Sequence, residues 1–170
     1  MDNKMKNIRV EKITLNVGAG TDKNVLDRGA LLLKAITGIE AVKTVAKKRI
    51  PGWNLRPGLP IGCKVTLRGK QAVDVLKRVL VAKDNKVPSS KFDKNGNFAF
   101  GLKEYIDIPG VKYDPAIGMM GFEVSVTLYR PGFRVKNRRL LKAKIGKNHL
   151  IKKEDAVAFA KSFGIEVVEE

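Results

Sequence analysis

The stretch PIGCKVTLRGK (residues 60–70) alternates strictly between apolar and polar side chains. Because successive side chains of a strand point to opposite faces of a sheet, a period of two predicts a half-buried β-strand. Its apolar side, which faces a core, consists of Ile61, Cys63, Val65 and Leu67. Its polar side, which is available to a ligand, consists of Lys64, Thr66 and Arg68.

Five further segments have the pattern of strands. Alternation predicts strands at residues 12–17, 97–102 and 122–129, and we expect shorter ones at 41–46 and 165–168. Upstream of the first strand, Ile8 and Val10 have the phase opposite to Ile13, Leu15 and Val17. This change of phase predicts that the strand pairing begins late or contains a bulge there.

Helices are expected between these strands. The first follows Thr21 or Asp22, either of which can cap it, and ends at Gly38. The second follows Gly69, an Asp74–Arg78 pair can form on its polar side, and its apolar side consists of Ala72, Val73, Leu76, Val79 and Leu80. The third stops at Gly164 and carries Ala156, Val157, Ala160 and Phe163.

This order of elements predicts one α+β domain over residues 1–170. We expect an antiparallel β-sheet with helices packed on one face and long basic loops. The other face of such a sheet is open, and its charge suits phosphate. It would present Lys64, Thr66 and Arg68 beside Thr14 and Asn16 of the first strand.

The charge is unevenly distributed. The 170 residues include 34 Lys and Arg against 17 Asp and Glu, a net charge of +17. Residues 41–73 hold eight basic residues and 124–153 hold ten, with no acid in either segment, so the rest of the chain is nearly neutral. This pattern indicates a polyanionic partner. Nucleic acid is favoured over a membrane, because neither segment forms an amphipathic helix with a wide apolar face.

Each acid-free segment contains a candidate RNA-binding loop. The first is residues 47–60, whose three prolines and two glycines indicate a loop, and its candidate residues are Lys47, Lys48, Arg49, Trp53 and Arg56. Trp53 either stacks on a base or folds back as a lid on the core. The second is the segment after Arg130, which either binds RNA or is a flexible solubilising stretch, and its candidate residues are Arg134, Lys136, Arg138 and Arg139.

Enzymatic sites find no support in the sequence. Gly18 and Gly20 suggest a dinucleotide loop, but the third glycine of that motif would fall at Lys23. His149 has no neighbouring Cys or Asp, so we expect no metal, no cofactor and no general base there. Cys63 is expected to be a buried, unreactive thiol, as suits a reducing compartment. Residues 1–7 contain no apolar stretch and no membrane span is present, so we expect a cytoplasmic protein.

Three quoted motifs together resemble the large-subunit ribosomal protein five family. They are KITLNVGAG (12–20), PIGCKVTLRG (60–69), and SKFD with GNF (90–93 and 96–98), and the resemblance covers nearly the whole chain. RPGF (130–133), KIGKNH (144–149) and KEDA (153–156) resemble the archaeal and eukaryotic branch. One departure is Ile39, which stands where the family often has glutamine.

The resemblance implies a function and a set of partners. It implies a non-catalytic protein that binds 5S rRNA in the central protuberance of the large ribosomal subunit, with 23S-type rRNA and other large-subunit proteins as neighbours. The family's RNA-facing asparagine and threonine fall on Asn16 and Thr66. The loop 47–60 is expected to reach the P-site tRNA, and another surface is expected to bridge to a small-subunit protein.

Two alternatives stay open at this point. The first is a free RNA chaperone, which would bind many RNAs with similar affinity. The second is an RNA-modifying enzyme, which would turn its substrate over rather than hold it.

Overall fold

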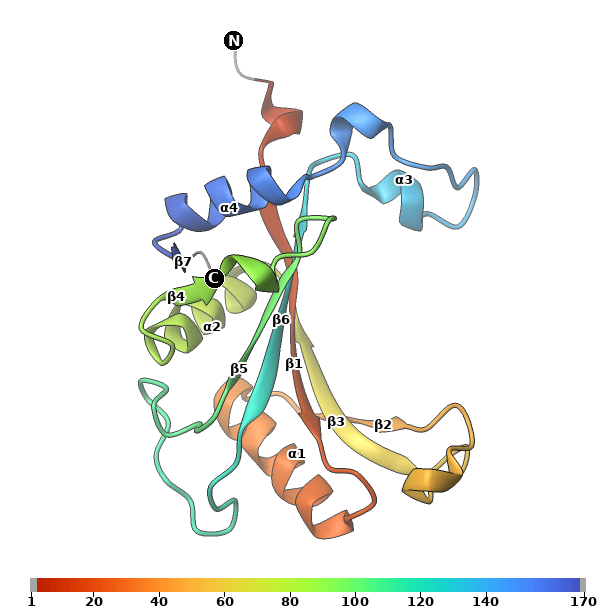
Figure 1. The fold of residues 1–170 in the computed structure, drawn as a ribbon, viewed down its shortest axis with the longest axis vertical. Helices are drawn as coiled ribbons and strands as arrows, with labels where there is room; N and C mark the ends of the chain where they lie inside the picture. The colour runs from red at the N-terminus through yellow and green to blue at the C-terminus, as the bar shows by residue number, and fades with distance from the viewer. Residues whose placement is uncertain (1–2, 169–170) are drawn as a thin grey trace.

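The structure, a computed structural model, describes residues 3–168, and its centre is an antiparallel sheet of five strands. The spatial order is β2–β3–β1–β6–β5 (Figure 1). The strands are β1 (Arg9–Gly18), β2 (Val42–Val45), β3 (Pro60–Leu67), β5 (Phe98–Leu102) and β6 (Phe122–Tyr129). The two outermost strands are the short ones, and β1 lies in the middle. The α+β architecture expected from the sequence is therefore confirmed.

Two helices, α1 (Lys23–Thr37) and α2 (Gly69–Val81), cover one face of this sheet. Two further helices follow the last strand of the sheet, α3 (Arg134–Asn137) and α4 (Lys153–Ser162). Single 3-10 turns lie at Lys4–Lys6, Pro51–Trp53, Ser89–Lys91 and Lys147–His149. Of the helices, α1 packs on β1 and β3, and α2 packs on β1. None of the helices among residues 3–168 is long and apolar enough to cross a membrane.

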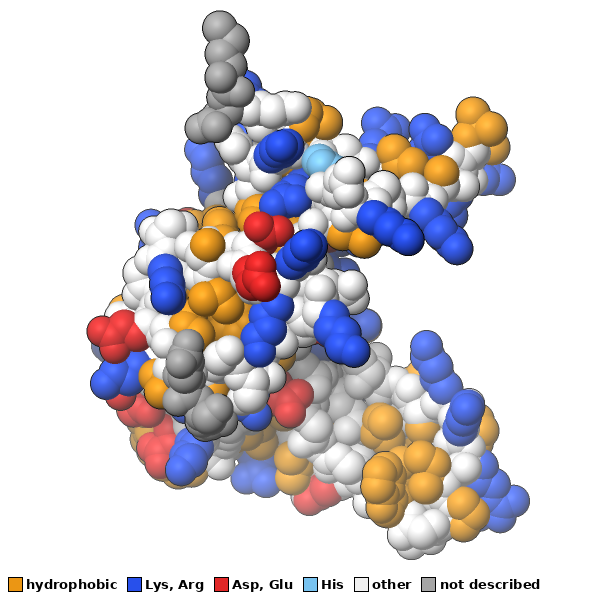
Figure 2. Space-filling model, turned by 45° about the horizontal axis from the view of Figure 1, so that its top comes forward, with side chains coloured by type: hydrophobic (Ala, Val, Ile, Leu, Met, Phe, Trp, Pro, Cys, Tyr) orange, Lys and Arg blue, Asp and Glu red, His pale blue; other side chains and the backbone are white. Residues whose placement is uncertain are grey.

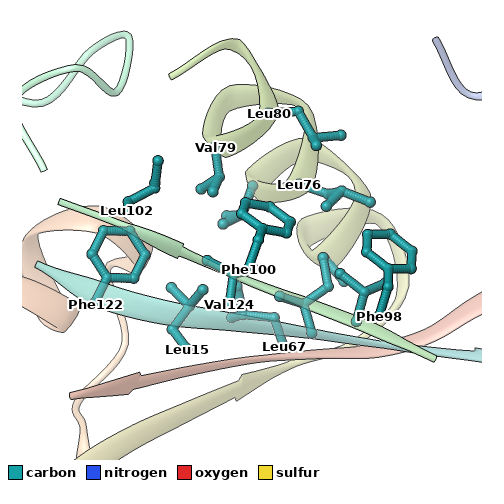
Figure 3. Close-up of a cluster of buried hydrophobic side chains, with 14 of the residues drawn as sticks. Leu15, Leu67, Leu76, Val79, Leu80, Phe98, Phe100, Leu102, Phe122 and Val124 are labelled. Atoms are coloured by element: carbon teal, nitrogen blue, oxygen red, sulfur yellow. The ribbon is translucent and has the colours of Figure 1, made fainter. Parts of the chain in front are cut away.

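The core lies between the sheet and these helices. Alternate strand residues such as Leu15, Leu67, Phe100 and Val124 point at Leu76 and Val79 of α2 (Figure 3). Each is almost fully removed from water. The core therefore leaves the other face of the sheet uncovered by α1 and α2, as the alternation in residues 60–70 predicted.

The ends of α1 follow the sequence signals. Asp22 is its N-cap, and the side-chain Oδ1 accepts a hydrogen bond of 2.8 Å from the backbone N–H of Asn24. Gly38 ends the helix in the left-handed conformation, with φ of 73°, and its N–H donates to the carbonyl of Lys34. The expected irregularity in β1 is also present, because the β1–β6 register shifts between Val10 and Lys12.

Two details of α2 differ from expectation. Val75, rather than Val73, is buried with the other apolar residues of the helix. Arg78 does not pair with Asp74; its Nη2 donates to the backbone carbonyl of Ile36 at 3.1 Å. The backbone carbonyl groups at the C-terminal end of α1 attract a cation. They compete with the solvated carboxylate of Asp74 for the Arg78 guanidinium, and an exposed ion pair with Asp74 would add little free energy.

A second, smaller sheet was not anticipated in full. The short strand expected at 165–168 is present as β7 (Glu166–Val168), but its partner β4 (Lys86–Pro88) was missed, and the two pair in parallel. Three residues are too few for an alternation signal. The pairing places β7 against the segment after α2, beside α4.

Candidate nucleic-acid interface

The open face of the sheet carries small polar side chains in aligned rows. Thr14 in β1 is opposite Thr66 in β3 on one side and Ser125 in β6 on the other. In the next row Asn16 lies between Lys64 and Glu123. The sequence expectation that Thr14, Asn16, Lys64 and Thr66 share a face is confirmed by this register.

These side chains are available to a ligand. Within residues 3–168, the side chains of Thr14, Asn16, Thr66 and Ser125 form no hydrogen bond with the protein, and each is at least partly exposed. Hydroxyl and amide groups can both donate and accept hydrogen bonds. The face is therefore suited to recognising hydroxyl, phosphate and base-edge groups rather than to attracting charge at a distance.

Arg68 stands apart from the other predicted face residues. It follows the last residue of β3 and serves as the N-cap position of α2. Its Nη1 lies 3.4 Å from Oε1 of Glu11, and its side chain is 60% exposed. The Glu11 side chain is 19% exposed, but solvent around the Arg68 end of the pair screens the interaction, so it contributes little free energy. Arg68 therefore keeps most of its capacity to bind an anion at the end of the face.

Residues Ala46 to Leu59 form a projection between β2 and β3, which we call the β2–β3 arm. Backbone bonds close its neck, from Ala46 N to Leu59 O at 2.8 Å and from Gly58 N to Ala46 O at 2.9 Å. Near its tip, Ile50 and Leu55 pair through two further bonds of 3.0 and 3.1 Å. The segment is thus a bridged hairpin extension, more regular than its proline content suggested.

The cationic residues of the β2–β3 arm point away from the core. Among the described residues, no ion pair engages any of its four cations, Lys47, Lys48, Arg49 and Arg56. Trp53 is 70% exposed, in the 3-10 turn at the tip. The interpretation of Trp53 as a lid on the core is therefore wrong, and its ring is available for stacking on a ligand.

Residues Arg130 to Lys152 form the second projection, which we call the second arm. Its neck is held by Nε2 of His149, which lies 2.8 Å from the carbonyl oxygen of Pro131, and by Arg130. The Arg130 guanidinium donates to Leu150 O at 3.2 Å and to Oδ2 of Asp155 in α4 at 3.1 Å. His149 also meets the buried ring of Phe133 edge-on. The arm is anchored, which disfavours the flexible solubilising alternative.

The four predicted cations of the second arm lie on or next to α3. Lys136 is half-buried, with Nζ 5.0 Å from the centre of the Phe133 ring. Arg138 Nε donates to Leu141 O at 2.7 Å, and Leu141 has a φ of 50°. Arg134 and Arg139 are exposed. No carboxylate within residues 3–168 pairs with any of the four.

The two arms lie on the same side of the molecule. In Figure 1 both leave the sheet away from α2 and α4. Figure 2 shows them as separate projections studded with Lys and Arg, with a hollow between them. The acid-free segments 41–73 and 124–153 are far apart in the sequence. In the fold, the arms that they contain place Lys and Arg side chains on both sides of this hollow.

Some features of this interface were not identified from the sequence. Ser125 and Thr127 share the open face with Thr14, and their alternation with Val124 and Val126 was the available signal. Glu123 is an acidic residue on this face and lies opposite Asn16. A carboxylate there limits how much negative charge can approach the β6 side, so the β3 side is electrostatically the more favourable one for phosphate.

Comparison with known proteins decides the family. Residues 3–56 match the family model described as "Ribosomal protein L5", and residues 60–159 match the model for the C-terminus of the same ribosomal family. The chain belongs to the ribosomal L5 family. It is therefore a structural protein of the large ribosomal subunit, in a family that is not enzymatic, and its partners are rRNA and other components of the ribosome. The RNA-modifying enzyme alternative is thereby excluded.

Archaeal relatives match over nearly the full length. "Large ribosomal subunit protein uL5" of Nanoarchaeum equitans is 48% identical over 170 residues, which cover 99% of this chain and 100% of that protein. The proteins of the same description from Sulfurisphaera tokodaii and Methanococcus vannielii are 46% and 45% identical, covering 98% of this chain and 96% and 94% of theirs. The second arm lies within these matches.

Proposed function

We propose that the chain binds 5S rRNA through the open face and the second arm, and so helps to attach that RNA in the central protuberance. The observation that carries this proposal is the set of polar side chains Thr14, Asn16 and Thr66, which form no hydrogen bond with residues 3–168, together with an anchored cationic arm. RNA offers phosphates to the arm, and 2′-hydroxyl groups and base edges to the face. Family membership supports an RNA partner, and the motifs at 12–20 and 60–69 support 5S rRNA in particular.

The β2–β3 arm has a separate role in this proposal, which is contact with the P-site tRNA. Its support is geometric and chemical. The arm projects from an edge of the sheet, its cations have no carboxylate partner among the described residues, and Trp53 at its tip is exposed. The family resemblance adds 23S-type rRNA, neighbouring large-subunit proteins and a bridge to a small-subunit protein as further contacts.

A direct binding comparison tests the proposal. We expect 5S rRNA to bind at least about tenfold more tightly than a tRNA or a random duplex of similar length, measured by filter binding in one buffer. The salt concentration must be identical, because affinity that depends on phosphate contacts falls steeply with salt. Equal affinities for the three RNAs would instead support the free RNA chaperone.

A further inference from the structure

A cavity of about 430 Å³ lies where the second arm meets the end of the sheet. Three parts of the chain that are distant in sequence form its walls. Asn95 and Asn97 come from the turn before β5, Thr127 and Leu128 come from β6, and the remaining walls come from the second arm. The cavity therefore forms only in the folded chain, where these three segments meet.

The walls are mostly apolar. Leu128, Phe133 and Ile151 are buried and form the inner part, whereas Ile145 and Leu150 of the arm are partly exposed at the opening. An unstacked nucleobase has lost the neighbouring bases that cover its two faces. Apolar side chains and an aromatic ring can take their place. The volume suits one nucleotide and excludes a duplex.

Two side-chain amides give the cavity polar groups of opposite character. Asn97 Oδ1 accepts a bond of 3.3 Å from the backbone N–H of Leu128, so its NH₂ group remains to donate. Asn95 Nδ2 donates to Oδ2 of Asp93 at 3.3 Å, so its oxygen remains to accept. A donor and an acceptor side by side match the edge of a base, which also presents both.

The opening is positively charged. Lys136 and Lys144 line the cavity, and none of the acidic residues between positions 3 and 168 does. The contact of Lys136 with the Phe133 ring positions its ammonium group over the apolar wall. An apolar side chain from a protein would fill the inner part but would leave both lysines without a counter-charge, whereas a nucleotide carries its phosphate next to its base.

We propose that this cavity receives one unpaired nucleotide of the bound rRNA, with the base against Phe133 and the phosphate on Lys136 and Lys144. The inference rests on the proposed function, since it assigns a subsite for the same RNA. The cavity would recognise a single nucleotide, whereas the open face and the two arms would bind the RNA backbone.

The test fills the cavity without changing charge. Ile145→Trp places a large ring at the opening, and Leu140→Trp is the matched control, because Leu140 is on the same arm but 77% exposed and outside the cavity. An archaeal 5S rRNA transcript is probed with dimethyl sulfate and a carbodiimide, which together report on the Watson–Crick edges of all four bases. We expect Ile145→Trp to remove protection at one unpaired base and to weaken binding roughly tenfold. Leu140→Trp should do neither.

A second variant removes a charge instead of adding bulk, so it tests for a nucleotide in the cavity without depending on how the tryptophan of Ile145→Trp packs. Lys144→Gln should expose the same base, whereas Lys142→Gln, on the same arm but outside the cavity, should weaken binding slightly and leave every base protected. Circular dichroism checks that each variant is folded. If folded Ile145→Trp and Lys144→Gln proteins both protect all the bases that the unaltered protein protects, the cavity holds no nucleotide. If the unaltered protein does not bind 5S rRNA at all, the proposed function fails first and this subsite with it.

Titration with the four nucleoside monophosphates distinguishes a free nucleotide from one in RNA. We expect millimolar or weaker binding, because the RNA chain supplies the local concentration that a free nucleotide lacks. Tight binding of a monophosphate that persists when 5S rRNA is added would assign the cavity to a free nucleotide and overturn the proposal.

Discussion

Thr14 and Thr66 are paired across β1 and β3, and both side chains are on the face of the sheet opposite α1 and α2. Neither hydroxyl group bonds to the protein within the described residues. The hydroxyl groups of the pair therefore do not stabilise the fold, and a β-branched apolar residue such as valine could replace either threonine in the strands. The two hydroxyl groups are better explained by a ligand than by stability.

Thr66→Val tests this explanation. Valine keeps the shape and the strand preference of threonine, so we expect the free energy of unfolding to change by less than about 0.5 kcal/mol. Binding of 5S rRNA should weaken by about 1–2 kcal/mol, because the substitution removes one hydrogen bond from a dehydrated part of the interface. Thr21→Val, in the turn before α1, is the control and should change neither quantity. Unchanged affinity of a folded Thr66→Val protein would mean that Thr66 faces water in the complex.

Gly29 is explained by the close approach of α1 to the sheet. A Cβ at this position would lie 2.9 Å from Val17 Cγ1 and 3.1 Å from Cys63 Sγ. Glycine inside a helix is otherwise unfavourable by about 1 kcal/mol relative to alanine. The contact with β1 and β3 therefore outweighs helix propensity here.

Gly29→Ala should destabilise the protein by about 1–2 kcal/mol, since overpacking a close contact exceeds the gain in helix propensity. Chemical denaturation measures the change. Gly101→Ala in β5 is the control, because its Cβ would meet no atom of residues 3–168 within 4 Å, and it should be nearly neutral. Combining Gly29→Ala with Val17→Ala should cost less than the sum of the two single changes. Additive costs would show that the crowding does not involve Val17.

The fold was largely predictable because its main strands have a buried and an open side. The alternation in residues 60–67 and 122–128 fixed which side chains share a face, and Asp22 and Gly38 marked the ends of α1. What was missed depends on contacts between distant segments. Two examples are the pairing of β4 with β7 and the hydrogen bond from Arg78 to the backbone carbonyl of Ile36 in α1. Neither is marked by a pattern in the neighbouring sequence. Each is decided by tertiary packing.

The candidate interface was predictable in composition but not in shape. The residues of the face and the cations of the arms could be identified from alternation and from the absence of acids. The cavity could not, because its walls come from the turn before β5, from β6 and from the second arm, which are distant in the sequence and meet only in the folded chain. Likewise, whether Trp53 covers the core or is exposed depends on the 3-10 turn that holds the tip.

Cys63 should be unreactive in the folded protein. Burial raises the pKa of its thiol, an effect that nearby Lys43 partly opposes. We expect no alkylation by iodoacetamide at pH 8 until the protein is unfolded with guanidinium, because the thiolate is the reactive species. Rapid alkylation of the native protein would show that β3 opens locally.

The raised pKa of Cys63 also predicts a dependence of stability on pH. The folded thiol keeps its proton at a higher pH than the unfolded thiol, so its contribution to stability is complete below the ordinary pKa of 9.0. That contribution is lost as the pH rises through the higher pKa of the folded state. The free energy of unfolding of the native sequence should therefore fall more steeply above pH 9 than that of Cys63→Ala. Parallel curves for the two proteins would contradict the assignment.

Excision of the β2–β3 arm tip separates the roles of the arm and the face. Residues 49–57 are replaced by a short glycine linker, which leaves the neck bond between Ala46 and Leu59 in place. We expect the fold to survive, because Leu55, the buried residue of the tip, is outside the main core.

Binding of isolated 5S rRNA should fall modestly, with a salt slope shallower by about one unit for each phosphate that the shortened arm no longer reaches. The larger defect should appear on assembled ribosomes, as weaker retention of P-site tRNA, and Trp53→Ala should reproduce part of it. If the excised protein is folded by circular dichroism yet no longer binds 5S rRNA, the β2–β3 arm is the main anchor, and the role assigned to the open face is wrong.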